Sequence, residues 1–192
     1  MYPNEYNFFP KTWILPSDAN DLKAQFNFKK TKTFIVKPVA NCQGRGIYLV
    51  RDFEKIDSRS GEQYVVQRYM HKPYLIDGLK FDMRIYVLLY GVDPLRLFVF
   101  REGLARFATE EYNCPVKSNM DNLYMHLTNY AINRNADNFI ANDDENDDDT
   151  GHKRSVTAVF KQIEEKEAGI TAEKLWAEIE DIAVKTLLSA TP

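Results

Sequence analysis

Polar and apolar residues alternate along residues 79–88, and this is the strongest pattern in the chain. The polar positions include Lys80, Asp82 and Arg84, with apolar side chains between them. Successive side chains of a β-strand point to opposite faces, so this spacing places two cations and one carboxylate on one face. Such a face suits a polyphosphate and its metal, because cations offset phosphate charge and the carboxylate can face the metal or a developing charge. A solvated face with cross-strand ion pairs is the alternative interpretation.

Further hydrophobic runs predict strands around two hairpins. Residues 33–37 favour a strand that Pro38 ends, and residues 47–50 favour its partner across a long loop with glycine near the tip. The remaining predicted strands are residues 63–70, 80–90, 95–101 and 104–109, with turns at 71–73, 93–94 and 102–103.

Helical periodicity is clearest near the end of the chain. Residues 171–190 predict a helix with Leu175, Ile179, Ile182 and Ala183 on one stripe. Two shorter helices are predicted, one at residues 155–162 and one through Leu22 and Phe26 with Ser17 or Asp18 as N-cap. Residues 125–133 are predicted to be strand or loop.

Composition narrows the class of protein. The 192 residues are 44% hydrophobic and 28% charged, which is enough for a packed core. The formal net charge is -3 and the pI is about 5.7, so there is no global basic field and we expect no nucleic-acid partner. No signal peptide and no membrane span are predicted. Cys42 and Cys114 form neither a disulfide framework nor a metal signature, which favours a reducing compartment.

Residues 143–149 hold six acids in seven positions. We predict a solvated loop, because clustered carboxylates repel one another. A calcium loop is not favoured, since the glycine and the terminal glutamate of an EF-hand are missing.

The loop of the first hairpin carries a second candidate site. Lys37 precedes it and Gly44-Arg45-Gly46 closes it. A Walker A loop joins a strand to a helix, whereas this one joins two strands. Glycines still allow backbone N–H groups to approach phosphates closely, and Lys37 could then reach an α- or β-phosphate. The alternative is a flexible hairpin with a surface lysine.

Gln67-Arg68-Tyr69-Met70 forms a third candidate at the end of a predicted strand. Exposed backbone groups there could pair with an adenine edge, and an apolar side chain could cover its face. The alternative is a strand terminus with a buried tyrosine and methionine.

Six motifs occur in an order that resembles the tubulin tyrosine ligase-like family, especially its polyglutamylase branch. Short segments near both ends of the chain, at residues 9–13 and 179–182, extend the resemblance. The six motifs are Ile35-Val36-Lys37-Pro38, Gly44-Arg45-Gly46-Ile47, Gln67-Arg68-Tyr69, Leu79-Lys80-Phe81-Asp82-Met83-Arg84, Glu102-Gly103-Leu104-Ala105-Arg106-Phe107 and His126-Leu127-Thr128-Asn129-Tyr130.

The resemblance implies an α+β protein with a partial ATP-grasp fold, made of antiparallel or mixed sheets with flanking helices. It also implies ATP and Mg²⁺ as cofactors. Lys37, Lys80, Asp82 and Arg84 are the implied catalytic residues. The positions implied for nucleotide binding are Lys37, Gln43, Gly44, Arg45, Gly46, Gln67, Arg68, Tyr69, Met70, Lys80, Asp82, Thr128 and Asn129.

Three further residues match positions that hold the incoming amino acid: Arg106, Tyr130 and Lys153. A guanidinium fork grips a carboxylate with two hydrogen bonds, which suits Arg106 to this role. The alternatives are a surface cation near a turn for Arg106 and a solvated charge beside the acidic segment for Lys153.

The resemblance also implies a division into lobes. Residues 1–72 correspond to part of a central lobe and residues 73–192 to a C-terminal lobe. We expect the magnesium ligands beyond Pro192 and most of an N-terminal lobe before Met1, so the chain by itself is expected to be inactive.

The implied activity is ATP-dependent ligation of glutamate to glutamate side chains or chains on tubulin tails. The expected partners are microtubules and free L-glutamate, with no membrane partner, and the expected state is a monomer. The expected location is the cytoplasm and cytoskeleton, including the cilium, its axoneme and the basal body. A glycine or tyrosine ligase of the same family and a non-catalytic microtubule-binding fragment are the alternatives. The sequence does not decide between α- and β-tubulin, or between starting and extending a chain.

Overall fold

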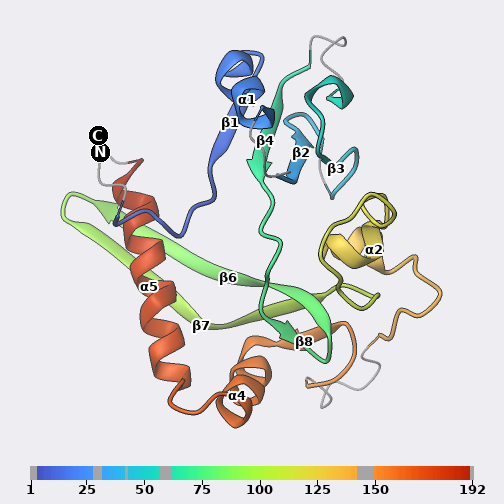
Figure 1. Ribbon diagram of the computed structural model, residues 1–192. Helices are drawn as coiled ribbons and strands as arrows, with labels where there is room; N and C mark the ends of the chain where they lie inside the picture. The colour runs from blue at the N-terminus through green and yellow to red at the C-terminus, as the bar shows by residue number, and fades with distance from the viewer. Residues whose placement is uncertain (1–3, 28–31, 42, 57–61, 142–148, 191–192) are drawn as a thin grey trace. The chain divides into compact units, whose positions relative to one another are not determined.

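The computed structural model describes residues 4–27, 32–41, 43–56, 62–141 and 149–190 (Figure 1). The chain forms two compact units. The glycine-loop unit comprises Phe9–Lys80 and Ala108–Asp137, and the long-hairpin unit comprises Met1–Phe8, Phe81–Phe107 and Asn138–Pro192. The lobe division at residue 72 remains a prediction.

The glycine-loop unit is built on a four-stranded sheet with the order β1-β4-β2-β3, in which each neighbouring pair is antiparallel. The predicted first hairpin is confirmed, because β2 pairs with β3. A two-residue strand β5 pairs with the first residues of β6. The bounds are β1 Thr12–Leu15, β2 Phe34–Pro38, β3 Tyr48–Val50, β4 Tyr64–Arg68 and β5 Leu75–Ile76.

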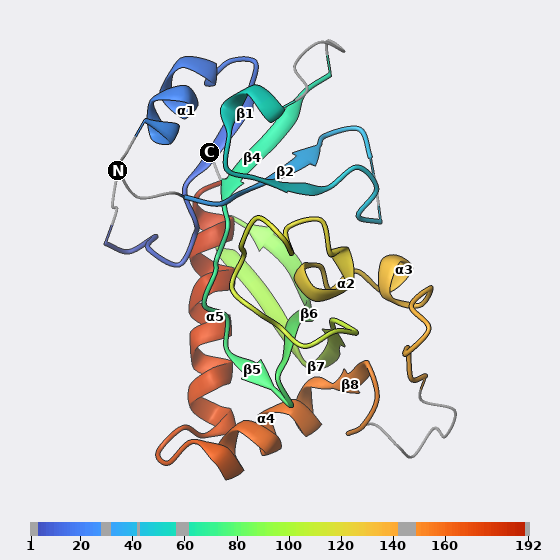
Figure 2. The same ribbon diagram turned by 45° about the vertical axis from the view of Figure 1, so that its right-hand side comes forward.

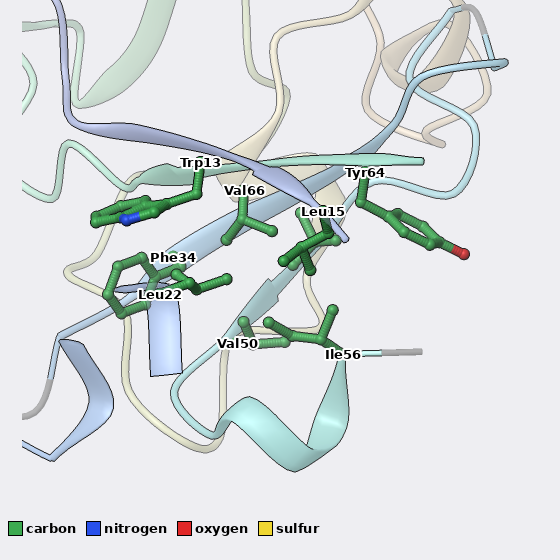
Figure 3. Close-up of a cluster of buried hydrophobic side chains, with 9 residues drawn as sticks. Trp13, Leu15, Leu22, Phe34, Val50, Ile56, Tyr64 and Val66 are labelled. Atoms are coloured by element: carbon green, nitrogen blue, oxygen red, sulfur yellow. The ribbon is translucent and has the colours of Figure 1, made fainter. Parts of the chain in front are cut away.

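One face of this sheet carries the core, which helix α1 (Ala19–Phe26) and the short 3-10 helix η1 (Phe53–Lys55) help to cover. Figure 3 shows Leu22 from α1 and Phe34 from β2 among the buried side chains. Trp13 and Phe34 meet edge to face with ring centroids 5.7 Å apart. The predicted short helix is confirmed, with Asp18 at its N-cap position. The Asp18 side chain accepts from the Ile14 backbone N–H at 2.7 Å and makes no capping bond to the helix.

The prediction of strand or loop for residues 125–133 is wrong in part, because two one-turn helices form there. They are α2 (Leu123–His126) and α3 (Tyr130–Asn133). Asn122 caps α2 by accepting from the Met125 N–H. The buried Asn133 side chain accepts from Thr109 and donates to two backbone carbonyls, so tertiary hydrogen bonds support turns that the sequence pattern does not signal.

The long-hairpin unit contains most of β6 (Leu79–Val92), together with β7 (Leu95–Phe107) and β8 (Lys153–Ser155). These strands pair antiparallel in the order β6-β7-β8, and the α+β class with antiparallel sheets is thereby confirmed. Helices α4 (Val156–Lys166) and α5 (Ala172–Leu188) confirm both predicted C-terminal helices.

The predicted turn at residues 102–103 is wrong, because β7 runs through it. Ile85 pairs with Gly103 and Tyr86 with Phe100, so the two residues between them bulge out of the ladder. A Cβ on Gly103 would lie 2.3 Å from the Arg84 carbonyl oxygen, which explains glycine at this close approach. Glu102 in the bulge accepts hydrogen bonds from the Val156 and Thr157 N–H groups at the start of α4.

Helix α5 lies along the apolar face of β6 and β7 (Figure 2). Met83 and Ile85 from β6 line an apolar groove together with Ile179, Ile182 and Ala183. The predicted apolar stripe of α5 therefore faces the sheet, and the polar row of β6 lies on the opposite face.

Most of the acidic segment, together with Cys42, lies outside the described residues. Within the described ranges Cys114 is a free, exposed thiol. No described helix combines the length and apolar character that crossing a bilayer requires.

Candidate functional site

A chain of polar contacts crosses three strands of the glycine-loop unit. The Lys37 ammonium donates to Gln67 Oε1 at 2.9 Å, and Gln67 Nε2 donates to Thr12 Oγ1 at 2.9 Å. Burial lowers the pKa of Lys37. The Gln67 amide orients the Lys37 ammonium without neutralising its charge, so this partly buried cation can bind an anion.

The glycine loop lies against the segment that holds Asn129. Gly44 is buried in the left-handed conformation with φ +84°. A Cβ there would lie 2.6 Å from Ile132 Cδ1 and 3.1 Å from Asn129 Cγ. Thr128 is buried just before Asn129. The structure therefore brings together two predicted nucleotide-binding segments that are far apart in the sequence.

The predicted adenine hinge leaves β4 with its side chains in contrasting environments. The Arg68 and Tyr69 N–H groups donate to the Lys11 and Thr33 carbonyls. Tyr69 is buried, whereas Met70 is 61% exposed. The alternative of a buried methionine is thus wrong, and an exposed apolar side chain beside the hinge suits the covering of a flat base.

Lys80 lies beside this hinge within the same unit. Its ammonium donates to the Tyr69 hydroxyl at 3.1 Å and to the His126 carbonyl at 2.7 Å. The ammonium also lies 4.6 Å from the centroid of the Tyr69 ring. These contacts hold Lys80 in one orientation, so the predicted phosphate cation and the predicted hinge residue are joined.

A row of charged residues crosses the sheet of the long-hairpin unit. Asp82 on β6 pairs with Arg106 on β7, and Arg106 pairs with Lys153 on β8. Side chains of directly paired residues share a face, so the row places two predicted amino-acid ligands next to a predicted catalytic carboxylate. Arg84 continues the Asp82 face two residues along β6.

The Arg106 fork is engaged by Asp82. Nε lies 2.8 Å from Oδ1 and Nη2 lies 2.9 Å from Oδ2. The alternative interpretation of this strand face, a solvated face with cross-strand ion pairs, is therefore correct for the Asp82–Arg106 pair. Tyr130, 46% exposed, belongs to the glycine-loop unit, whereas the charged row belongs to the long-hairpin unit. The predicted loop residues Gln43, Arg45 and Gly46 are exposed.

Comparison with known families matches residues 2–192 to the tubulin-tyrosine ligase family. The chain belongs to the tubulin-tyrosine ligase family. It is 51% identical over 194 residues to a probable beta-tubulin polyglutamylase of Tetrahymena thermophila, and 50% identical over 192 residues to the tubulin polyglutamylase ttll6 of Danio rerio. It is 45% identical over 192 residues to the tubulin polyglutamylase TTLL6 of Homo sapiens.

Each of these matches covers 100% of this chain. They cover 16%, 24% and 20% of the three relatives, so the chain spans about a fifth of their length. The family resemblance inferred from the order of the six motifs is confirmed.

The side chains of this tubulin-tyrosine ligase family member fit a nucleoside triphosphate. Lys37 Nζ donates to the Gln67 amide oxygen, and Lys80 Nζ donates to the Tyr69 hydroxyl and the His126 carbonyl. Ammonium groups are charge-assisted donors that suit phosphate oxygens. In the row of Asp82, Arg106 and Lys153, the Asp82 carboxylate is the candidate ligand for magnesium. Among the described residues, no three His, Cys, Asp or Glu side chains gather as a metal site. The identity of the magnesium ligands stays a prediction.

Two buried residues that support the site were not singled out from the sequence. His126 is fully buried beside Tyr69, and Asn133 is 1% exposed behind Asn129. His126 stands in one of the six motifs, which was the available signal. Nothing in the local pattern marks Asn133, because its role depends on three segments meeting.

Proposed function

We propose that the protein containing this chain ligates glutamate to glutamate residues of tubulin tails in an ATP-dependent reaction. Family membership supports the ligase class, and the names of the relatives support tubulin as substrate. An ATP-grasp fold is part of the proposal, supported by the two units with antiparallel sheets. The observation that carries the amino-acid choice is the direct pairing of Arg106 with Lys153 across β7 and β8.

Two adjacent cations suit free glutamate, which carries two carboxylates at neutral pH. Arg106 would grip one carboxylate through its fork, and Lys153 would hold the other. Glycine would leave one cation without a partner in a closing pocket, which costs affinity. Arg106 must exchange Asp82 for the substrate carboxylate, or share its remaining N–H groups between them.

The reaction needs no covalent protein nucleophile. The acceptor γ-carboxylate attacks the γ-phosphorus of ATP, so that ADP leaves and an acylphosphate forms. The amino group of free glutamate then attacks the acyl carbon, the phosphate leaves, and the nitrogen loses a proton as the isopeptide bond forms. Lys37, Lys80 and Arg84 would stabilise the charge on the transferring phosphate, and magnesium would neutralise phosphate oxygens.

The proposal includes the setting of the reaction. The protein would act as a monomer on microtubules, and hence in the cytoplasm and cytoskeleton, including cilia. Extending glutamate chains and starting them are both compatible with the charged row.

The test is incorporation of labelled amino acids into microtubules by the full-length protein. We expect glutamate to be incorporated far above glycine or tyrosine. Arg106→Ala should lose activity with every amino acid, whereas Lys153→Ala should lose mainly the glutamate preference. Arg101→Ala is the matched control, because Arg101 lies on the same strand but pairs with Glu173 and Glu180 on α5. Equal use of glycine and glutamate by the intact protein would overturn the assignment in favour of another family activity.

A further inference from the structure

A buried hydrogen-bonded chain leads from Lys80 through Tyr69 to His126. Lys80 Nζ lies 3.1 Å from the Tyr69 hydroxyl oxygen, which lies 3.1 Å from His126 Nδ1. His126 Nε2 lies 3.1 Å from the Asn119 carbonyl oxygen. The imidazole is fully buried and Tyr69 is 4% exposed, so both side chains are largely shielded from solvent.

The chemistry of the donors allows one consistent assignment of hydrogens along this chain. A lysine ammonium only donates, so the Tyr69 oxygen accepts from Lys80. The Tyr69 hydroxyl also meets the Tyr112 hydroxyl, which itself donates to the His71 carbonyl. The Asn119 carbonyl can only accept and so calls for a hydrogen on Nε2, which leaves Nδ1 of a neutral ring to accept from Tyr69. Nε2 therefore carries the imidazole hydrogen and donates to the Asn119 carbonyl.

The other two protonation forms of His126 fit worse. With the hydrogen on Nδ1 alone, Nε2 would direct its lone pair at the Asn119 carbonyl oxygen, and two acceptors would face each other. With both nitrogens protonated, a second buried cation would lie close to Lys80. Burial lowers the pKa of His126, in keeping with a neutral ring.

His126 acts on Lys80 through its main chain as well. The His126 carbonyl oxygen accepts from Lys80 Nζ at 2.7 Å. Tyr69 and Tyr112 meet the imidazole edge to face, with centroids 5.7 and 5.8 Å away, and so restrict its rotation. Thr128 and Asn129 lie two and three residues after His126, so this short segment connects the orientation of Lys80 with the segment beside Gly44.

We propose that His126, as its Nε2–H tautomer, is a positioning residue that orients the Lys80 ammonium for nucleotide phosphate by fixing the Tyr69 hydroxyl. The inference rests on the proposed function only for the assignment of Lys80 to phosphate. Lysine has a long flexible stem, so an ammonium ordered before the nucleotide arrives avoids part of the entropy cost of binding.

The test uses nucleotide affinity of the full-length protein, measured with ADP and with a non-hydrolysable ATP analogue. His126→Leu and Tyr69→Phe should each weaken binding roughly tenfold and raise the KM for ATP, with little change in the KM for glutamate. Since both variants break the same chain, the double variant should be no weaker than the weaker single variant. His126→Asn should recover most of the affinity, because its amide oxygen can accept near the Nδ1 position.

Tyr64→Phe is the matched control. It removes a hydroxyl from another buried tyrosine of the same unit, one that donates to Glu62. This variant should bind nucleotide as the wild type does. Additive losses in the His126 and Tyr69 variants, or unchanged affinity in a folded His126→Leu protein, would overturn the proposal.

A second measurement observes the wild-type protein directly and needs no nucleotide. Imidazole ¹⁵N shifts of the histidine-labelled wild-type protein should show one ring with Nε2 protonated and Nδ1 accepting, assigned by its loss in His126→Asn. An Nδ1–H or doubly protonated ring at neutral pH would contradict the proposal. If that ring has the expected form but Lys80→Ala binds nucleotide normally, the phosphate role of Lys80 fails and the positioning chain stands as structure alone.

Discussion

Asp82 on β6 and Arg106 on β7 form a bidentate ion pair, with both N–O distances below 3 Å. The resemblance assigns these two residues to different ligands, the nucleotide with its metal and the incoming amino acid. Their pairing means that a change at either ligand site acts directly on a residue of the other. The pair is partly exposed, so it contributes little to the stability of the fold. Its main effect is to orient the two side chains.

Replacing Arg106 by lysine tests the value of the fork. Arg106→Lys keeps the charge but cannot make two parallel hydrogen bonds, so the KM for glutamate should rise at least tenfold. The free energy of unfolding should fall by about 1 kcal/mol or less. Steady-state kinetics and urea unfolding of the full-length protein measure both. Arg101→Lys, on the same strand with its own partners on α5, should leave the KM unchanged. If Arg106→Lys lowered the free energy of unfolding strongly but left the KM for glutamate nearly unchanged, the ion pair would have a structural role only.

Removing the Lys80 ammonium should sharply weaken nucleotide binding. A lost charge-assisted phosphate contact costs about 1.5–3 kcal/mol, or roughly 10- to 150-fold in affinity. Lys80→Ala should also abolish ligation, because the charge is needed most in the transition state. Calorimetric titration with ADP checks the affinity. Lys72→Ala changes an exposed lysine and serves as the control. Wild-type turnover in Lys80→Ala would rule out the phosphate role.

Gly44→Ala should impair nucleotide binding because of where its methyl group would point. The new Cβ would displace Ile132 and press on Asn129. Gly169→Ala is a close control, since Gly169 has φ +85° and nothing within 4 Å of an added Cβ. Both changes carry a left-handed backbone cost of about 1 kcal/mol, so a difference in nucleotide affinity between them isolates the contact. Equal affinities would show that the loop position does not matter for the nucleotide.

Gly103→Ala should damage the long hairpin itself. Its Cβ would meet the Arg84 backbone, which cannot move aside as a side chain can, and we expect a loss of about 2–3 kcal/mol or more. Gly91 lies on β6 of the same hairpin, where an added Cβ would come no closer than 3.4 Å to the Pro94 oxygen. Gly91→Ala should therefore be nearly neutral in chemical unfolding. A well-folded Gly103→Ala protein would contradict the bulge geometry.

Stability should decline as pH falls through 6.5. Burial lowers the pKa of both His126 and His152 below the ordinary 6.5, so the unfolded chain takes up protons first. Stability is therefore unaffected by these groups above that pH and is lost as pH drops towards the folded pKa values. Burial raises the pKa of the Tyr69 and Tyr112 hydroxyls that face His126, so both stay neutral in this window. Unfolding midpoints at pH 7.5, 6.5 and 5.5 measure the slope, and His126→Asn should reduce it. An unchanged slope in that variant would mean that His126 does not contribute.

The sequence pattern predicted those helices and strands that are determined by neighbouring residues in the sequence. The β2–β3 hairpin, α4 and α5 follow from alternation, helical periodicity and capping by Ser155 and Thr171. Such signals lie within about ten residues of sequence and need no distant partner. The order of motifs likewise sufficed for the family, since it depends on residue identity alone.

Contacts between distant segments decided the rest. The one-turn helices α2 and α3 have too few residues to be stable alone. Asn122 caps α2, and Asn133, the last residue of α3, ties that helix to Thr109 by hydrogen bonds. The bulge before Gly103 arises from pairing with β6. Without knowledge of that pairing, the Glu-Gly sequence at residues 102–103 is typical of a turn. The chain from Lys80 to His126 and the pairing of Asp82 with Arg106 require folding to bring donors and acceptors within 3.1 Å of each other. A sequence specifies which groups can bond, but the tertiary structure decides which of them come close enough to do so.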